Sequence, residues 1–256
     1  MLAKAAGIGV DEVVIDLEDA VRPERRSIAR ELAIRALGEL EWRAPSLSVR
    51  VNAHCEEDVT ALAGASRPPS TIVLPKVESH DDVASAGRLL AGGTIGIQAL
   101  IETPVGVLRA LEIAAASDRV VALIVGYADL AAVIGGRRTP DQWRTVQDTV
   151  LLAARAAGID AIDGPFLSIR DADGLRAAAT TAAQLGFDGK WAIHPDQVPL
   201  IVEAFTPSEG EVARAREVVS ALERSDRGAV AADGEMLDEA VRVAAKRLLA
   251  RAEAAS

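Results

Sequence analysis

The chain has 256 residues, half of them hydrophobic, and a formal net charge of −10 at pH 7. This acidic balance argues against non-specific binding to nucleic acid or anionic membranes, because both need clustered basic side chains. The single cysteine, Cys55, excludes an intramolecular disulfide, and without an apolar run of about 18 residues or a charged-then-apolar leader we expect a cytoplasmic protein.

Strands and helices alternate along the chain. Short runs rich in Val, Ile, Leu and Ala predict strands of a parallel sheet covered on both faces. In chain order these are Glu12–Leu17, Ser48–Val51, Thr71–Leu74, Gly96–Ile101, Val121–Val125, Asp160–Ile162 and Lys190–Ile193. Apolar residues at helical spacing predict helices at Glu24–Leu40, Glu56–Ala65, Asp81–Ala91, Val105–Ala116, Pro140–Ala157, Ala172–Leu185 and Pro195–Ala204.

This alternation favours an α/β fold of the TIM (β/α)8 type, which has eight strand-helix units, whereas seven are visible here. Met1–Ala6 is typical of the end of a helix whose strand is absent. We therefore expect a barrel that lacks its first strand and a true N-terminus upstream of Met1. Residues 1–205 are predicted to form the barrel catalytic domain. Residues 206–256 are predicted to form a C-terminal extension of two helices, from Pro207 to Arg224 and from Met236 to Ala252.

Each predicted strand ends in polar residues. In chain order these are Asp16-Leu17-Glu18-Asp19, Arg50, Lys76, Glu102, Asp129, Asp163 and His194. In a parallel barrel the strand interiors fill the core, and the carboxyl ends of the strands open toward substrate. The polar strand ends therefore predict an active site at one mouth of the barrel.

Six segments at these ends occur in a recognisable order and spacing. They are Val14-Ile15-Asp16-Leu17-Glu18-Asp19-Ala20-Val21, Val49-Arg50-Val51-Asn52, Leu74-Pro75-Lys76-Val77-Glu78-Ser79, Leu100-Ile101-Glu102-Thr103, Gly126-Tyr127-Ala128-Asp129-Leu130 and Gly189-Lys190-Trp191-Ala192-Ile193-His194-Pro195. Together they resemble the citrate lyase beta-subunit-like (CitE-like) family of the HpcH/HpaI aldolase superfamily, over nearly the whole chain. The tail segment Gly234-Glu235-Met236-Leu237-Asp238 is similar to the family's C-terminal lid motif.

The resemblance implies a Mg²⁺-dependent carbon-carbon lyase, with Mn²⁺ as an alternative metal. Its substrate would be a 3-hydroxyacyl-CoA thioester such as malyl-, citramalyl- or citryl-CoA, so coenzyme A would enter as part of the substrate. The metal ligands that it implies are Glu102 and Asp129. Two carboxylates suit Mg²⁺, which takes oxygen ligands and keeps several waters. Consecutive strands place both acids at the same mouth.

Further site residues follow from the same resemblance. Arg50 is predicted to present its planar fork to a carboxylate or 2-oxo group of the shorter cleavage fragment. Glu18 and Asp19 are predicted to accept hydrogen bonds from metal-bound water or from Arg50, which would orient those groups. Lys76 and Lys4 are candidates for binding the CoA phosphates, because an acidic protein must meet an anion with a local cationic pocket.

Asp238 of the lid motif is implied as the proton-transfer residue, delivered from a neighbouring subunit. The active protein would then be a homo-oligomer, either a trimer or a hexamer. A structural interpretation stays open, since an aspartate that begins or lines an exposed helix is usually just solvated.

Structural interpretations also stay open for other strand-end residues. Glu102 is alternatively a solvated acid at the start of a helix, and Asp129 alternatively caps the helix Leu130–Ile134. Asp16 is expected to be buried and to face away from the mouth. His194 is either a general base or a hydrogen-bonded residue that closes the last strand. Asp163 either positions substrate or forms a turn with Gly164.

Ala128 is a departure from the resembled pattern. The CoA lyases often carry glutamate before the ligand aspartate, and Gly126-Tyr127-Ala128-Asp129 is closer to the form in aldolases of free 2-oxo acids. The sequence therefore leaves two alternatives to the CoA-thioester lyase. One is a metal-dependent aldolase of free 2-oxo-4-hydroxy acids, and the other is a noncatalytic CoA-binding paralogue.

Overall fold

The computed structural model describes residues 1–135, 140–224, 229–232 and 235–254. Two compact units divide the chain, Met1–Val198 and Pro199–Ser256. The predicted boundary between a catalytic domain, residues 1–205, and a lid extension, residues 206–256, stays a prediction. None of the helices within the described residues has the length and hydropathy needed to cross a membrane.

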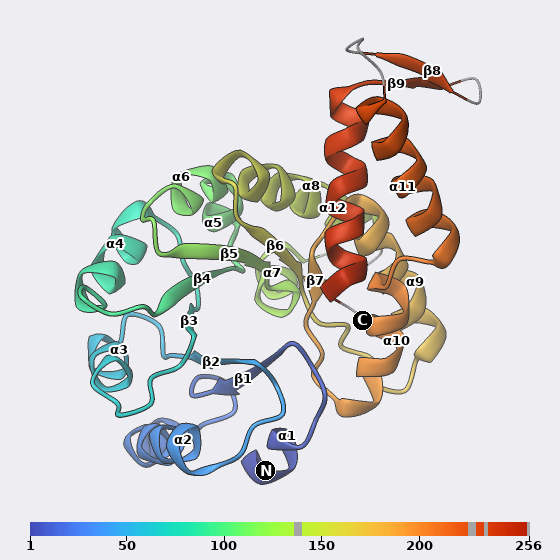
Figure 1. Ribbon diagram of the computed structural model, residues 1–256. Coiled ribbons are helices and arrows are strands. Elements are labelled where there is room, and N and C mark those ends of the chain that lie inside the picture. The colour runs from blue at the N-terminus through green and yellow to red at the C-terminus, as the bar shows by residue number, and fades with distance from the viewer. Residues whose placement is uncertain (136–139, 225–228, 233–234, 255–256) are drawn as a thin grey trace. The chain divides into compact units, whose positions relative to one another are not determined.

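A curled, all-parallel sheet of seven strands forms the centre of the first unit (Figure 1). The strands pair in sequence order, so each strand lies beside the one before it and the one after it. They are β1 (Glu12–Asp16), β2 (Ser46–Arg50), β3 (Thr71–Leu74), β4 (Gly96–Ile101), β5 (Val120–Val125), β6 (Asp160–Asp163) and β7 (Gly189–Lys190). This confirms the α/β class and the parallel sheet, in an arrangement consistent with a TIM-type barrel wall.

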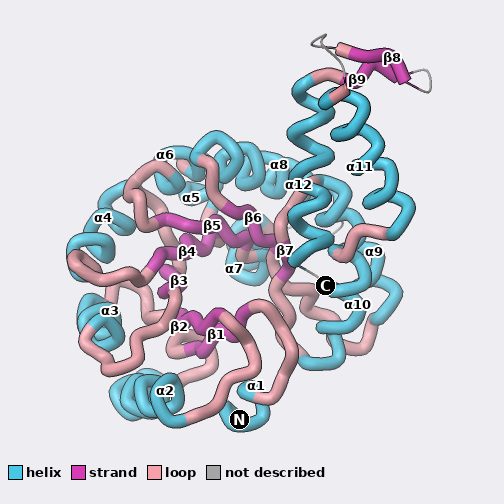
Figure 2. Tube along the Cα trace, viewed as in Figure 1, coloured by secondary structure: helices cyan, strands magenta, loops and turns pink. Residues whose placement is uncertain are grey.

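The helices of the first unit lie on the outer side of this sheet, except α7, which Figure 2 draws inside its curl. They are α1 (Leu2–Ala6), α2 (Arg26–Glu39), α3 (Glu56–Ala63), α4 (His80–Leu89), α5 (Pro104–Leu108), α6 (Ala110–Ala114), α7 (Tyr127–Ile134), α8 (Pro140–Ala157) and α9 (Ala172–Leu185). The single helix predicted at Val105–Ala116 is wrong, because the backbone leaves helical geometry at Arg109, with ψ of 15°, and divides it into α5 and α6.

Apolar side chains fill the inside of the sheet. Val73, Leu100 and Ile124 are buried together, with Ile162 and Trp191 packed against them. All six residues of β4 are buried, as expected for a strand of a parallel sheet that is covered on both faces. The interior is thus a packed core rather than a pore, and only the strand ends are available for chemistry.

The amino ends of β1 to β4 carry a buried polar layer. Gln98 Nε2 donates to Glu12 Oε1 at 2.7 Å and lies 2.8 Å from Thr71 Oγ1. Ser48 also donates to Glu12 Oε1. These hydrogen bonds give partners to Glu12, Ser48 and the Gln98 amide nitrogen, which the core would otherwise leave without them, whereas Gln98 Oε1 is buried without a partner among the described residues.

The last strand is shorter than predicted. We expected it at Lys190–Ile193, whereas β7 is Gly189–Lys190. Trp191 N still donates to Asp163 O at 2.9 Å, but Ile193 N donates to the side chain of Gln197 at 2.9 Å. A side-chain acceptor therefore replaces the neighbouring strand and turns the chain into the 3-10 helix Pro195–Gln197.

The second unit contains α10 (Val198–Phe205), α11 (Glu209–Glu223), α12 (Glu239–Ala254) and an antiparallel pair, β8 (Val230–Ala232) with β9 (Glu235–Leu237). A core formed by Ala215, Val218, Leu237 and Ala245 joins α11 to α12. The helix predicted from Met236 is wrong at its start, because Met236 lies in β9. Helix α12 begins only after Asp238, whose side chain accepts a hydrogen bond from Val241 N at 3.1 Å.

A buried acid joins the loop after β2 to two helices. Asp58 of α3 is 1% exposed and accepts hydrogen bonds from Asn52 N at 3.0 Å and Asn52 Nδ2 at 2.7 Å. Its other oxygen pairs with Arg30 of α2 at 2.8 Å. Burial opposes the charge on Asp58, but these donors outweigh it and hold the pKa of the carboxyl below its ordinary value of 3.8.

We predict that Asp58→Asn lowers the free energy of unfolding at pH 7 by about 1–3 kcal/mol, because the amide cannot accept from both sets of donors. Since the folded pKa is depressed, this stabilisation is complete above pH 3.8 and is lost as the pH falls through the folded value. Urea unfolding at several pH values should show the difference from wild type disappearing in acid. Glu57→Gln is the control, because Glu57 also pairs with Arg30 but is 75% exposed, and a shift as large as that of Asp58→Asn would contradict the interpretation.

Candidate functional site

The predicted site residues of the first unit, except Lys4, meet at the carboxyl ends of adjacent strands. Glu18 and Asp19 follow β1, Arg50 ends β2, Lys76 follows β3 and Glu102 follows β4. Asp129 lies in the first turn of α7, directly after β5. Because the strands are parallel and pair in order, these side chains lie at the same end of the sheet.

Arg50 is held by three acids. Its Nε and Nη2 donate to the two oxygens of Asp16 at 2.8 and 2.7 Å, and its Nη1 lies 3.2 Å from Glu18 and 3.3 Å from Asp19. Burial opposes the charge on Arg50, but these partners raise the pKa of its guanidinium. The Nε–Nη2 edge is thus occupied by Asp16, so a substrate anion would meet the Nη1 end of the fork.

The expected position of Asp16 is wrong. This acid does not face away from the mouth, because it is the bidentate partner of Arg50. Its two oxygens also accept from Glu18 N at 3.0 Å and Ala20 N at 3.1 Å. Burial disfavours its charge, but the Arg50 and backbone donors lower its pKa. Asp16 therefore fixes both the arginine and the loop that carries Glu18.

Lys76 lies inside the acid group rather than in a separate basic patch. Its Nζ is 2.5 Å from Glu18 Oε1 and 3.3 Å from Asp129 Oδ2. Burial opposes its charge, yet Glu18, Glu102 and Asp129 raise the pKa of the ammonium. The arrangement does not favour a CoA phosphate contact for Lys76, which stays a prediction. Lys4 lies exposed on α1, and its phosphate contact is likewise a prediction.

Glu102 is the most deeply buried acid of the group, at 4% exposure. Its Oε1 accepts a hydrogen bond from Lys76 N at 2.8 Å. Burial raises the pKa of the carboxyl to about 8; the Lys76 N–H lowers it, and the charge of Asp129 raises it further. The interpretation as a solvated acid at a helix start is therefore wrong. The following helix is capped instead by Thr103, which accepts from Gly106 N at 3.0 Å.

Asp129 is partly exposed and does not cap its helix. Helix α7 begins at Tyr127, two residues before Asp129, and no side chain caps it. The capping interpretation is therefore wrong. Its carboxylate points instead to the Lys76 ammonium and lies close enough to Glu102 to raise that pKa.

The donor set fits a divalent cation. Among the described residues no group of three His, Cys, Asp or Glu side chains has metal-ligand geometry. Mg²⁺ does not require one, because it is commonly bound by one or two carboxylates together with waters. Glu102 is a buried acid whose charge is disfavoured by burial and by Asp129, and a dication between these two acids would favour both ionised forms.

Gly126 allows β5 to approach the Glu102 side chain. A Cβ at this position would lie 2.3 Å from Glu102 Cβ and 2.9 Å from Glu102 Oε2. Both distances are shorter than any real contact of a Cβ. Only glycine therefore permits this position of Glu102.

A second buried group at the ends of β6 and β7 was not predicted. Lys190 Nζ donates to Asp163 Oδ2 at 2.5 Å and to Gly164 O at 2.6 Å, and the two charged side chains are 2% and 1% exposed. Tyr127 also donates to Asp163, and Gln147 Nε2 lies 2.8 Å from the Tyr127 hydroxyl. Burial and the charge of Asp163 raise the pKa of Tyr127. The sequence signal for this group was a lysine, Lys190, at the start of the predicted last strand.

The remaining predicted residues have local structural partners. His194 Nδ1 accepts from Asp196 N at 3.2 Å, as the structural interpretation expected, but it caps the 3-10 helix Pro195–Gln197 and does not close β7, which ends at Lys190. Asp238 caps α12 in the second unit, and Gly234 of the lid motif lies outside the described residues. The proton-transfer role of Asp238 stays a prediction.

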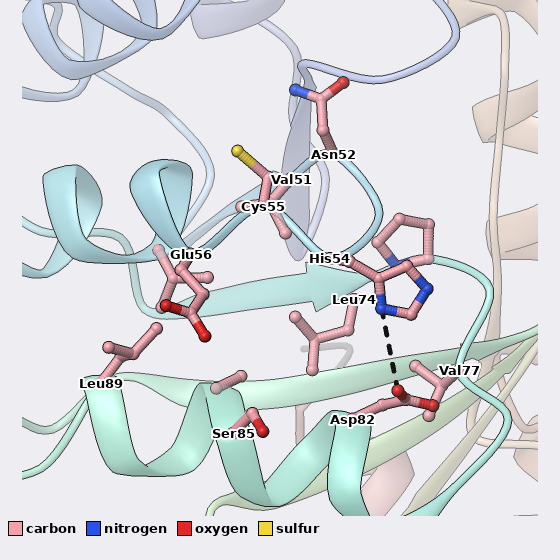
Figure 3. Close-up of a pocket in the computed structure, with 13 residues that line it drawn as sticks. Val51, Asn52, His54, Cys55, Glu56, Leu74, Val77, Asp82, Ser85 and Leu89 are labelled. Carbon is pink, nitrogen blue, oxygen red and sulfur yellow. Dashed lines mark ion pairs between the residues drawn. The ribbon is translucent and has the colours of Figure 1, made fainter.

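A cavity of about 160 Å³ lies between the loop after β2 and α4 (Figure 3). His54 Nδ1 is 3.8 Å from Asp82 Oδ1 at its rim. Cys55 also lines it, but burial raises the pKa of this thiol, which disfavours a reactive thiolate. None of the predicted site residues lines this cavity, although Val51, beside Arg50, and Pro75 and Val77, on either side of Lys76, do.

A family model described as HpcH/HpaI aldolase/citrate lyase matches residues 1–195. A (3S)-malyl-CoA thioesterase of Cereibacter sphaeroides is 36% identical over 262 residues, which are 99% of this chain and 90% of that protein. An L-malyl-CoA/beta-methylmalyl-CoA lyase of the same species is 35% identical over 288 residues, 99% of this chain and 91% of that protein.

Solved structures of citrate lyase proteins are also similar to this chain. CitE of Mycobacterium tuberculosis, in complex with magnesium, acetoacetate and coenzyme A, is 38% identical with a TM-score of 0.79, and covers 98% of this chain and 92% of its own. A citrate lyase of Burkholderia xenovorans is 26% identical with a TM-score of 0.83, and covers 95% of this chain and 83% of its own.

We predict that Gly126→Ala weakens Mg²⁺ binding by more than about tenfold, because the added Cβ displaces Glu102. Titration calorimetry on the folded variant measures this. Gly38→Ala in α2 is the matched control, since no atom lies within 4 Å of its Cβ position. It should keep the wild-type affinity, and unchanged binding in Gly126→Ala would remove Glu102 from the metal site.

Proposed function

Because the chain belongs to the HpcH/HpaI aldolase/citrate lyase family, we propose that it is a Mg²⁺-dependent carbon-carbon lyase acting on a 3-hydroxyacyl-CoA thioester. The observation that carries this proposal is the pairing of Glu102 and Asp129 at adjacent strand ends, in one acid group with Arg50 and Lys76. Relatives that span almost the whole chain are named for malyl-CoA chemistry. Malyl-CoA is therefore the first substrate to test, followed by citramalyl- and citryl-CoA.

Glu102 and Asp129 would hold the Mg²⁺ or Mn²⁺ ion. When bound, the ion supplies a Lewis acid that polarises oxygen atoms of the substrate. Arg50 would bind the carboxylate or 2-oxo group through Nη1, whose contacts to Glu18 and Asp19, at 3.2 and 3.3 Å, are longer than those of the other two nitrogens to Asp16. Asp16, Glu18 and Asp19 would keep Arg50 in place, because together they contact all three of its nitrogens.

Cleavage requires three changes in the substrate. The 3-hydroxyl group loses its proton to a base, the bond between C2 and C3 breaks to give an oxo compound, and the thioester fragment leaves as an enolate. The enolate carbon then takes a proton. We propose Asp238 of a neighbouring subunit for this proton transfer, which would make the active enzyme a homo-oligomer. Lys4 stays our candidate for the CoA phosphates, for which Lys76 is poorly placed.

The proposal also includes the complete barrel and the lid. The seven strands would be the wall of an eight-stranded TIM-type barrel, and residues 206–256 would be its lid extension. The support is the unbroken order of β1 to β7, with β1 and β7 as the two edges of the described sheet. A cytoplasmic location is proposed on the cysteine content, since Cys55 is the only cysteine.

A second candidate function is hydrolysis of the thioester. It is favoured by the 36% identity to a malyl-CoA thioesterase. The two reactions give different products from malyl-CoA, because the lyase yields glyoxylate and acetyl-CoA whereas hydrolysis yields malate and free CoA. Both would use the same acid group, so product analysis must decide between them.

We predict that the purified protein with Mg²⁺ releases glyoxylate and acetyl-CoA from malyl-CoA. Chromatography of the CoA species together with a glyoxylate assay checks this. Malate with free CoA and no glyoxylate would instead establish the thioesterase. Cleavage restricted to CoA-free 2-oxo-4-hydroxy acids would favour the aldolase to which Ala128 points, and CoA binding without turnover would favour the noncatalytic paralogue.

We also predict that Glu102→Gln loses at least about a hundredfold in Mg²⁺-dependent turnover, because a neutral amide is a poor metal ligand. The fold should be retained, since Gln resembles the protonated acid and can still accept from Lys76 N. Turnover is measured at increasing Mg²⁺ beside Glu112→Gln, an exposed acid on α6. Wild-type rates at saturating metal would exclude Glu102 as a ligand.

A further inference from the structure

Lys76 has an unusual backbone conformation for its residue type. Its φ is 52°, in the left-handed region that favours glycine. Such strain persists only where the surroundings hold it, and it clusters at functional sites. Here Lys76 N donates to Glu102 Oε1 at 2.8 Å, and its Nζ reaches Glu18 and Asp129. The strained residue therefore contacts three acids through its two ends.

The two contacts of the ammonium are unequal. The one to Glu18 is short, at 2.5 Å, and Glu18 is buried. The one to Asp129 is 3.3 Å long, and the Lys76 and Asp129 side chains are 38% and 39% exposed. Water weakens an exposed pair far more than a buried one, so the contact to Asp129 is the one that can be broken at small cost.

Lys76 also occupies the region in which a metal ion would add positive charge. The Arg50 guanidinium binds Glu18 from the other side, so the acid group already holds two cationic side chains. A dication on Glu102 and Asp129 would stand beside the ammonium, and like charges at this range repel. The Lys76 ammonium and the metal therefore compete for Asp129.

We propose that Lys76 is a displaceable counter-ion of the metal site. It holds Asp129 while no metal is bound, and its ammonium moves from Asp129 to Glu18 alone when a divalent cation binds. This inference rests on the proposed function, because it takes Glu102 and Asp129 as the metal ligands. Lys76 is thus a positioning residue, and its presence lowers the affinity for Mg²⁺.

The test compares Mg²⁺ binding by titration calorimetry in wild type and Lys76→Met. Methionine is similar in length to the lysine chain up to Cε and keeps the backbone N–H that donates to Glu102, but it removes the ammonium together with its contacts to Glu18 and Asp129. We expect Mg²⁺ to bind about tenfold more tightly, because a like charge beside the ion is lost. Lys246→Met, on an exposed lysine of α12 in the second unit, is the matched control and should keep the wild-type affinity.

Lys76→Arg separates charge from shape, since it keeps the positive charge. The Mg²⁺ affinity of this variant should either lie within about threefold of that of wild type or be lower. Equal or weaker binding in Lys76→Met would overturn the inference, because the ammonium would then assist the metal. Absence of Mg²⁺ binding to the wild type would instead refute the proposed function itself.

A measurement on the wild type applies even if Lys76→Met does not fold. The chain has four lysines, so the ammonium signals in a ¹⁵N NMR spectrum are few enough to assign by substitution. Titration with Mg²⁺ should shift the Lys76 signal and leave that of Lys246 unchanged. An unmoved Lys76 signal at saturating Mg²⁺ would also overturn the inference.

Discussion

The neutralisation of clustered acids is the constraint on which this site depends. Asp16, Glu18, Asp19, Glu102 and Asp129 gather at one end of the sheet, and the contacts place only Arg50 and Lys76 against them within the described residues. Five acids and two cations leave an excess of negative charge. Glu102 shows part of the consequence: burial is the main reason that its pKa rises to about 8, and the charges of Asp129 and Glu18 raise it further. A divalent metal would offset most of the excess charge.

The parallel sheet accounts for where this excess arises. Each strand runs in the same direction and pairs with its neighbour in sequence, so acids 27 residues apart, Glu102 and Asp129, come together. The core leaves no alternative position for them, since the strand interiors bury apolar side chains. Gly126 then permits the close approach of β5 to Glu102. The parallel sheet therefore determines where the acids that would bind the metal lie.

The sequence predicts elements better than it predicts contacts. The bounds of β3 and β4 follow from their apolar runs, and the polar strand ends follow from the repeat. The direction of Asp16, the break at Arg109 and the short β7 depend on single-residue changes in register or dihedral angle, which no composition signal carries. Lys76 was predicted as a site residue, but its partners come from β1 and α7, and its φ of 52° has no sequence signature. The proposed role of Asp238 requires a neighbouring subunit, so the sequence and structure of a single chain do not test it.

Two lysines at strand ends illustrate how exposure separates structure from function. Lys190 pairs with Asp163 at 2.5 Å, both are almost fully buried, and Tyr127 and Gln147 complete the hydrogen bonds. Breaking such a pair leaves a buried charge, so it is a fixed part of the scaffold. Lys76 has an equally short contact to Glu18 but an exposed one to Asp129. Water and a metal can reach that second contact. Lysine is therefore structural at the end of β7 and displaceable after β3. The difference arises from the access of water and metal to the ion pair, since the two short contacts have the same length.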